Sequence, residues 1–265
     1  MEISKLMKYT VKEDIKNYYD EATSLKLKDY VYGNAREDKA WQTIKRYVQQ
    51  PKNILEIGCG IGIMSHRCHQ YWPDAEIIGI DISERSVSIA NALFKTDHCS
   101  FYTSLPTHLD GQNRFDVIML IDVLEHVEIE QRPELLNLIK NNLSEQGMLL
   151  LAFPTPNMLN INRTHFPERL QPVEVDIHIA DLLEISNTIG LPLIFYKEVF
   201  VSEKRDYAHS IFADILAENI EKKQALREQV VAKLKSYFQN DKRNDTQFER
   251  KLRVLEKLNI DVQNP

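Results

Sequence analysis

Three glycines at alternating positions, followed by an aspartate, are the residues of this sequence whose spacing best suits ligand binding. Gly58, Gly60 and Gly62 come after an apolar run, and Asp81 closes the next apolar run. Glycine lets a backbone approach a ligand closely and adopt positive φ. A carboxylate can accept hydrogen bonds from both hydroxyls of a ribose. The pattern fits a dinucleotide, a nucleoside sulfonium such as S-adenosylmethionine, or a packing turn with Asp81 as a helix cap.

The spacing of the glycines argues against the dinucleotide. The fingerprint of nicotinamide-binding folds is G-x-G-x-x-G. Counted from Gly58, the sixth position is Ile63, and counted from Gly60 it is Ser65. The sequence instead reads E-x-G-x-G-x-G from Glu56.

A second group of chemically capable residues lies in "IDVLEHVE". A helix that begins near Asp122 would place Asp122, Glu125 and His126 on one face, because their spacing is i, i+3 and i+4. In one interpretation His126 or a carboxylate is the general base for a hydroxyl or an amine. In another, the three side chains bind a divalent ion that polarises a hydroxyl. In a third, they only shape the pocket.

The elements that must position these residues alternate along the chain. Short apolar runs predict strands, and longer amphipathic stretches predict the helices between them. Such alternation indicates crossover connections, a parallel sheet and an α/β fold. The predicted strands are 53–57, 76–80, 99–103, 115–121, 148–153, 191–201 and 207–212, and the predicted helices are 62–72, 83–95, 132–143 and 179–190. Residues 154–176 are predicted to form a loop.

Helical segments precede and follow this pattern. Residues 1–50 contain scattered aromatic side chains and a helix capped by Asn34, and they are predicted to form a lid. Residues 51–212 form the ligand-binding domain, and residues 213–265 form a helical extension. The apolar positions of the extension are Leu226, Val230, Val231, Leu234, Tyr237, Phe238, Phe248, Leu252, Leu255 and Leu258. This stripe packs on the sheet domain or forms a homodimer through the C-terminal helices.

The composition limits the classes of molecule that this chain is expected to bind. The chain of 265 residues has a net charge of −6, which argues against nucleic acid or an acidic membrane as a partner and favours a small-molecule acceptor. The three cysteines form no C-x-x-C pair, and the charged N-terminus is not a signal peptide. No apolar run is long enough to span a bilayer. We therefore expect a cytoplasmic protein.

Four motifs resemble those of the class I S-adenosylmethionine-dependent methyltransferases. They are "LEIGCGIG", "GIDIS", "FDVIMLIDVLEHV" and "GMLLLAFPTPN", within residues 52–200. The resemblance implies a Rossmann-like, seven-stranded, mostly parallel sheet with one antiparallel strand and helices on both faces. It also implies a helical N-terminal lid, a C-terminal helical extension, and S-adenosyl-L-methionine as the cofactor.

The same resemblance implies roles for individual residues. The three glycines would lie along the methionine part of the cofactor, Glu56 would support their loop, and Asp81 would hold the ribose. Ile82 and Leu105 would lie near the adenine. In the lid, Arg36 would pair with the cofactor carboxylate, and Tyr19 or Tyr32 would close over the sulfonium.

The spacing of Asp122, Glu125 and His126 also resembles that of ubiquinone-pathway O-methyltransferases and small-RNA 2′-O-methyltransferases. That resemblance adds His178 as a fourth metal ligand or a substrate contact, although Asp122 stands where glutamate is usual. Arg163 and His165, in the predicted loop, are further candidates for substrate binding. We thus expect methyl transfer to an oxygen or nitrogen of a small molecule. The alternatives are a metal-dependent RNA 2′-O-methyltransferase and a non-catalytic nucleotide-binding or scaffold protein.

Overall fold

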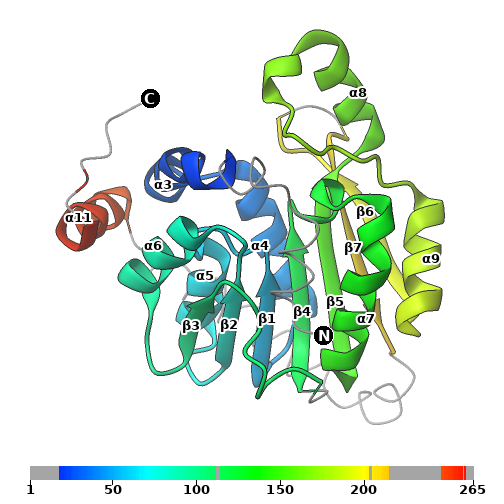
Figure 1. Ribbon diagram of the computed structural model, residues 1–265, viewed down its shortest axis with the longest axis horizontal. Coiled ribbons are helices and arrows are strands. Elements are labelled where there is room, and N and C mark those ends of the chain that lie inside the picture. The colour runs from blue at the N-terminus through cyan, green and yellow to red at the C-terminus, as the bar shows by residue number, and fades with distance from the viewer. Residues whose placement is uncertain (1–17, 112–113, 203–204, 215–245, 259, 261–265) are drawn as a thin grey trace, which may run out of the picture.

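A seven-stranded sheet forms the centre of the molecule (Figure 1). The computed structural model describes residues 18–111, 114–202, 205–214, 246–258 and 260. The order of the strands is β3-β2-β1-β4-β5-β7-β6, in which β7 runs antiparallel to both of its neighbours. The strands are β1 (Asn53–Ile57), β2 (Glu76–Ile80), β3 (Cys99–Tyr102), β4 (Phe115–Ile121), β5 (Leu143–Pro154), β6 (Leu193–Val199) and β7 (Tyr207–Ala213). The predicted Rossmann-like sheet is confirmed.

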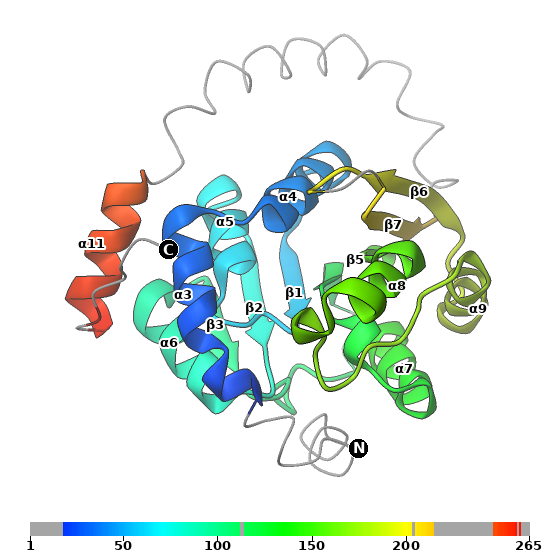
Figure 2. The same ribbon diagram turned by 90° about the horizontal axis from the view of Figure 1, so that it is seen from above.

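Helices cover both faces of the sheet (Figure 2). One face packs against α4 (Ala35–Tyr47), α5 (Ile63–Tyr71) and α6 (Glu84–Phe94), and the other against α7 (Arg132–Asn142) and α9 (Ile179–Ile189). The central strands supply both cores because successive side chains point to opposite faces. In β1, for example, Ile54 enters the first core, whereas Leu55 and Ile57 enter the second.

Local sequence explains where several helices begin and end. The side chain of Asn34 accepts a hydrogen bond from the backbone of Arg36 at the start of α4. Ser83 caps α6 in the same way, and Gly190 ends α9 in the left-handed conformation. In the described residues, no helix combines the length and apolar composition needed to cross a bilayer.

The segment after β5 differs from the predicted loop. It contains α8 (Pro156–His165) and the short 3-10 helix η3 (Pro167–Arg169). The hydroxyl of Thr155 accepts a hydrogen bond from the backbone of Met158, and Pro156 occupies the first turn, where proline is tolerated. Pro156 therefore marks the start of a helix within the stretch that was predicted to be a loop. In addition, β5 begins directly after α7, earlier than the predicted residue 148.

The last described helix, α11 (Gln247–Leu258), packs on α3 (Thr23–Tyr32) and α6 of its own chain. Val254 is fully buried there, whereas Leu252 and Leu255 are 40% and 42% exposed. The predicted stripe is thus on the outer face at these two positions. Its positions from Leu226 to Phe238 lie outside the described residues. The homodimer stays a prediction.

The ends of three parallel strands meet at one point. Ile57, the last residue of β1, pairs with Ile80 of β2 and Leu120 of β4. Just beyond β4, Asp122 has a φ of +55°, so the chain turns sharply and the predicted helix does not begin there. Two short 3-10 turns follow instead, η1 (Leu124–His126) and η2 (Ile129–Gln131). Aspartate tolerates this left-handed conformation better than most residues.

This turn brings Val123 against the backbone of Gly58. A Cβ atom added to Gly58 would lie 2.3 Å from Cγ2 of Val123, and Gly58 itself has a φ of +75°. Its backbone N–H donates to the carbonyl of Ile80. Glycine is therefore required here both for its conformation and for the space that Val123 occupies.

We expect Gly58→Ala to lower the free energy of unfolding by about 2–4 kcal/mol, measured by denaturant titration, because it adds a left-handed strain and a steric clash. Gly190→Ala is the matched control. Gly190 also has a positive φ (+78°), but no atom lies within 4 Å of the point that an added Cβ would occupy. It should lose only the conformational part, about 1–2 kcal/mol.

The substitution Val123→Ala in the Gly58→Ala background should restore part of the lost stability, because it removes the clashing methyl groups. Equal losses in Gly58→Ala and Gly190→Ala, with no recovery in the double variant, would contradict the packing argument.

Candidate functional site

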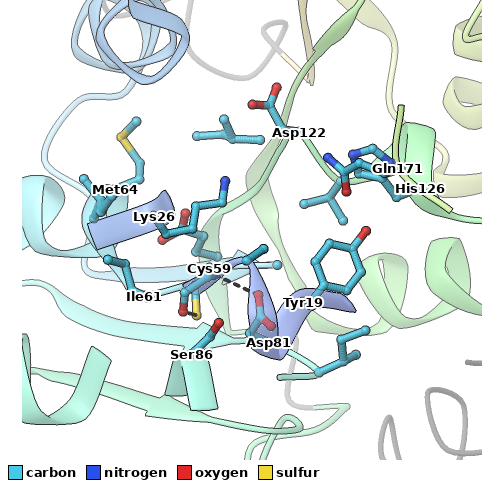
Figure 3. Close-up of a pocket in the computed structure, with 18 of the residues that line it drawn as sticks. Tyr19, Lys26, Cys59, Ile61, Met64, Asp81, Ser86, Asp122, His126 and Gln171 are labelled. Carbon is cyan, nitrogen blue, oxygen red and sulfur yellow. Dashed lines mark hydrogen bonds between the residues drawn. The ribbon is translucent and has the colours of Figure 1, made fainter. Parts of the chain in front are cut away.

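A cavity of about 250 Å³ opens where the parallel strands end (Figure 3). Its walls come from residues 18–29 of the N-terminal segment, the turn after β1, the ends of β2 and β4, and the loop between η3 and α9. Ligands of open α/β sheets bind at this edge, because crossover connections leave a crevice beyond the carboxyl ends of the strands.

The glycine turn supplies the floor of the cavity, but its three glycines do different things. Gly58 and Gly60 line the cavity, and the space in front of Gly60 is open, with no atom within 4 Å of an added Cβ. Gly62 does not line it. An added Cβ there would lie 2.6 Å from the ring of Phe101. Gly62 therefore makes room for core packing, and its place along the ligand stays a prediction.

Asp81 lies at the end of β2 and faces the same cavity (Figure 3). One carboxylate oxygen accepts from the backbone N–H of Gly60 at 2.8 Å, and the other from that of Ser83 at 2.9 Å. Burial raises the pKa of Asp81, and these two N–H donors oppose the rise. Each oxygen keeps further acceptor capacity, so both can still bind ligand hydroxyls.

The structure places the other three predicted residues of this region, Ile82, Leu105 and Glu56, in different surroundings. Ile82 lines the cavity beside Asp81. Leu105 does not line it and is buried in the core beneath α7 and α9, and its contact with the adenine stays a prediction. Glu56 accepts hydrogen bonds from the backbone and hydroxyl of Ser65, in the first turn of α5. It therefore anchors the helix that follows the glycine turn, as the resemblance implied, and burial raises its pKa to about 8.

The lid residues line the cavity in part. Tyr19 lies over it, with its ring centroid 6.4 Å from that of His126, whereas Tyr32 is not in the lining. Arg36 pairs with Asp122 at 3.1 Å and donates to the hydroxyl of Tyr207 at 3.0 Å. The attraction of Asp122 raises the pKa of Arg36 further. Arg36 is therefore already bound within the chain, by Asp122 and Tyr207, and does not need a ligand carboxylate to balance its charge.

His126 is held in one orientation at the other side of the cavity. Its Nδ1 lies 2.8 Å from the carbonyl oxygen of Val173. Because a carbonyl only accepts, Nδ1 carries the proton in that bond, and Nε2 has a free lone pair in the neutral ring. Burial is the main cause that lowers the pKa of His126. The geometry therefore suits proton acceptance at Nε2.

Glu125 lies behind His126 and does not line the cavity. It is 1% exposed, and one of its oxygens approaches Nε2 of His126 only to 3.7 Å. Burial, followed by the charge of Asp122, raises the pKa of Glu125 well above its ordinary value. Its backbone carbonyl accepts from the N–H of Val175. The backbone at position 125 therefore helps to hold the loop that carries Val173.

Three predicted substrate residues lie away from the cavity. His178 is exposed at the start of α9, where its backbone N–H donates to Asp181 at 2.6 Å. Arg163 binds both oxygens of Asp176, at 2.9 and 3.0 Å, and His165 is exposed at the end of α8. None of the three lines the cavity.

The four proposed metal ligands are not brought together. Asp122 pairs with Arg36, Glu125 is behind the cavity wall, and His178 is on the surface. In the described part of the chain, no group of three or more His, Cys, Asp or Glu side chains is arranged to hold a metal ion. The predicted metal set is therefore corrected on the geometry of its donors.

Lys26, Glu37 and Gln171 are among the polar cavity residues that no sequence pattern indicated. Lys26 of α3 and Glu37 of α4 are charged residues on amphipathic helices, where charge normally indicates a solvated face. Gln171 lies in a loop, and its Oε1 is buried without a hydrogen-bond partner among the described residues. Only tertiary contacts reveal that these side chains face a ligand site.

The comparison with known families agrees with this arrangement. Residues 32–184, more than half of the chain, match the family model described as a methyltransferase domain. The match includes the glycine turn, Asp81 and the turn that carries His126.

Individual relatives are similar over shorter stretches. The chain is 38% identical over 52 residues to the malonyl-[acyl-carrier protein] O-methyltransferase of Anoxybacillus flavithermus, which is 20% of each chain. It is 29% identical over 102 residues to the ubiquinone biosynthesis O-methyltransferase of Rhodopseudomonas palustris, covering 37% of this chain and 38% of that one. The chain therefore matches only about a fifth to two fifths of the length of these relatives.

Solved structures share the fold. The magnesium protoporphyrin IX methyltransferase of Synechocystis, solved with bound SAH, superimposes with a TM-score of 0.55 at 18% identity. That superposition covers 76% of this chain and 97% of the other. Together with the family model, which spans the cavity, this finding leads to one conclusion: the chain belongs to the methyltransferase-domain family.

Proposed function

We propose that this protein is an S-adenosylmethionine-dependent methyltransferase that acts on an oxygen or nitrogen of a small molecule. The observation that carries the proposal is the meeting of the glycine turn and Asp81 in one cavity, within the stretch that matches the family. The cofactor supplies a methyl group already activated on a sulfonium.

The residues of the cavity fit such a cofactor. Asp81 offers two carboxylate oxygens to a ribose, and Ile82 beside it offers an apolar surface to a base. Gly60 leaves open space next to Asp81. Tyr19 presents an aromatic side chain to the same cavity, and an aromatic face attracts a cation.

His126 is proposed as the general base for the acceptor. The carbonyl of Val173 fixes the ring so that Nε2 carries the lone pair. Removal of a proton by a positioned base contributes about 10²–10⁴-fold to a rate, whereas orientation alone can lower a barrier by about 7–11 kcal/mol. Orientation of the acceptor is therefore the larger contribution, and His126 adds to it.

A small acceptor is favoured by charge and by the shape of the site. The net charge of −6 opposes a polyanion such as RNA. The RNA 2′-O-methyltransferase alternative also required a four-residue metal set, of which Asp122 is paired with Arg36 and His178 is exposed on the surface. The scaffold alternative does not explain why His126, a residue of the cavity lining, is held in one orientation by the carbonyl of Val173.

The proposed function is tested by transfer of a labelled methyl group from S-adenosylmethionine to a panel of small hydroxyl and amine compounds, with total RNA as the competing substrate. Label that becomes soluble only after ribonuclease treatment would support the RNA alternative. Cofactor binding without turnover on any acceptor would support the scaffold alternative.

We expect Asp81→Ala to weaken binding of S-adenosylhomocysteine by about 10- to 100-fold in calorimetry, because a hydrogen bond to a charged group contributes about 1.5–3 kcal/mol. The control is Asp74→Ala, at an exposed position before β2, which should bind as the wild type does. Binding of NAD in place of S-adenosylhomocysteine would contradict the assignment.

We expect His126→Ala to reduce turnover by about 10²–10⁴-fold while cofactor binding changes less than about twofold. His108→Ala, at an exposed position outside the cavity, is the control and should retain turnover. Unchanged turnover in His126→Ala would remove His126 from the mechanism.

The pH dependence follows from the lowered pKa of His126. The base must be neutral, and the neutral ring persists below its ordinary pKa of 6.5. The turnover number at saturating cofactor and acceptor should therefore stay level from about pH 8 to 6.5 and decrease only at more acid pH. A decrease with a midpoint above 6.5 would show that His126 is protonated too readily for this role.

A further inference from the structure

Glu37 is a charged residue of the cavity that the mechanism above leaves unused. It lies on α4 and lines the cavity. Its Oε2 is buried and has no hydrogen-bond partner among the described residues. A buried carboxylate oxygen without a donor is costly, so it indicates a place where a ligand donor completes the hydrogen bonding.

Asp122 is a second carboxylate of the cavity that has one oxygen without a hydrogen-bond donor. One oxygen of Asp122 pairs with Arg36, and Oδ1 is buried without a partner in the described part of the chain. Glu37 and Asp122 both line the cavity. Burial is the main cause of the raised pKa of Glu37, and the negative charge of Asp122 raises that pKa further. Figure 3 shows that Asp122 and Asp81 lie at opposite ends of the cavity, with Lys26 between them.

The charges around Glu37 do not neutralise it by contact. Lys26 and Asp29 face it from α3, Arg67 from α5, Glu56 from β1, and Asp122 from the end of β4. The guanidinium of Arg67 is bound to Asp38 at 2.8 Å. The cavity lining therefore has two acids, Glu37 and Asp122, each with one oxygen that lacks a donor among the described residues, and these attract a cation that carries N–H donors.

We propose that Glu37, together with Asp122, binds the α-ammonium group of the amino-acid end of the cofactor. This assignment rests on the proposed function, because it needs the ribose at Asp81. The ammonium group has three N–H donors and one positive charge, so it supplies what both free oxygens lack. Glu37 is then a cofactor-binding residue contributed by the lid helix α4.

The test compares two ligands by calorimetry. S-adenosylhomocysteine carries the amino-acid end, and 5′-methylthioadenosine lacks it. Glu37→Gln is expected to weaken S-adenosylhomocysteine by about 10- to 100-fold and to change 5′-methylthioadenosine by less than about twofold. Glu134→Gln, at an exposed position of α7, is the matched control and should bind both ligands normally.

A second measurement uses the wild type alone. Burial raises the pKa of Glu37 to about 7, and an ammonium group beside it lowers that pKa. Binding of S-adenosylhomocysteine near pH 7 should therefore release protons, detected in two buffers of different ionisation enthalpy, whereas 5′-methylthioadenosine should release fewer. This measurement is valid even where the variant folds poorly.

The outcomes separate the two proposals. Equal losses for both ligands, or no loss for S-adenosylhomocysteine, would overturn the role of Glu37 and leave the proposed function in place. Failure of the wild type to bind either adenosine compound would overturn the proposed function and this assignment with it.

Discussion

The contact between Val123 and the bare backbone of Gly58 determines how closely β1 and β4 can end beside each other. A side chain at Gly58 would occupy the position of the Val123 methyl groups. The left-handed Asp122 makes the same contact possible, because it turns the chain directly after β4. The positions of Asp122 and His126 relative to the glycine turn depend on this close approach, because both residues lie in the turn that carries Val123.

The carboxylates of the cavity differ in whether the chain supplies hydrogen-bond donors to all of their oxygens. Burial raises the pKa of Glu56 and of Asp81, yet each carboxylate accepts hydrogen bonds from N–H groups of the chain. Glu37 and Asp122 each keep an oxygen without a donor among the described residues. The satisfied pair holds the glycine turn in shape, and the unsatisfied pair leaves capacity for a ligand. A polar site that is incomplete in this way is expected where binding must complete the hydrogen bonds.

The first and last described helices, α3 and α11, pack against each other beside this site. Helix α3 lines the cavity with Lys26 and Asp29, and α11 packs on its outer side. Arg253 of α11 donates to the hydroxyl of Tyr30 on α3 at 2.8 Å. The C-terminal helix therefore contributes to the position of α3 although it does not itself line the cavity.

The order of elements, the glycine turn and Asp81 were predictable from sequence alone. Apolar runs, caps such as Ser83 and glycine stops such as Gly190 act over a few residues, and local sequence encodes them. The helix start at Pro156 was misjudged because proline marks both loops and first turns.

Tertiary structure alone decided which side chains reach the cavity. Gly62 and Leu105 pack in the core, whereas His178 is exposed on the surface. Glu37 lines the cavity. The pairing of Arg36 with Asp122 and of His126 with Val173 joins segments that lie far apart in the chain. No local pattern carries such information, because the direction of each side chain depends on packing between elements that are distant in sequence.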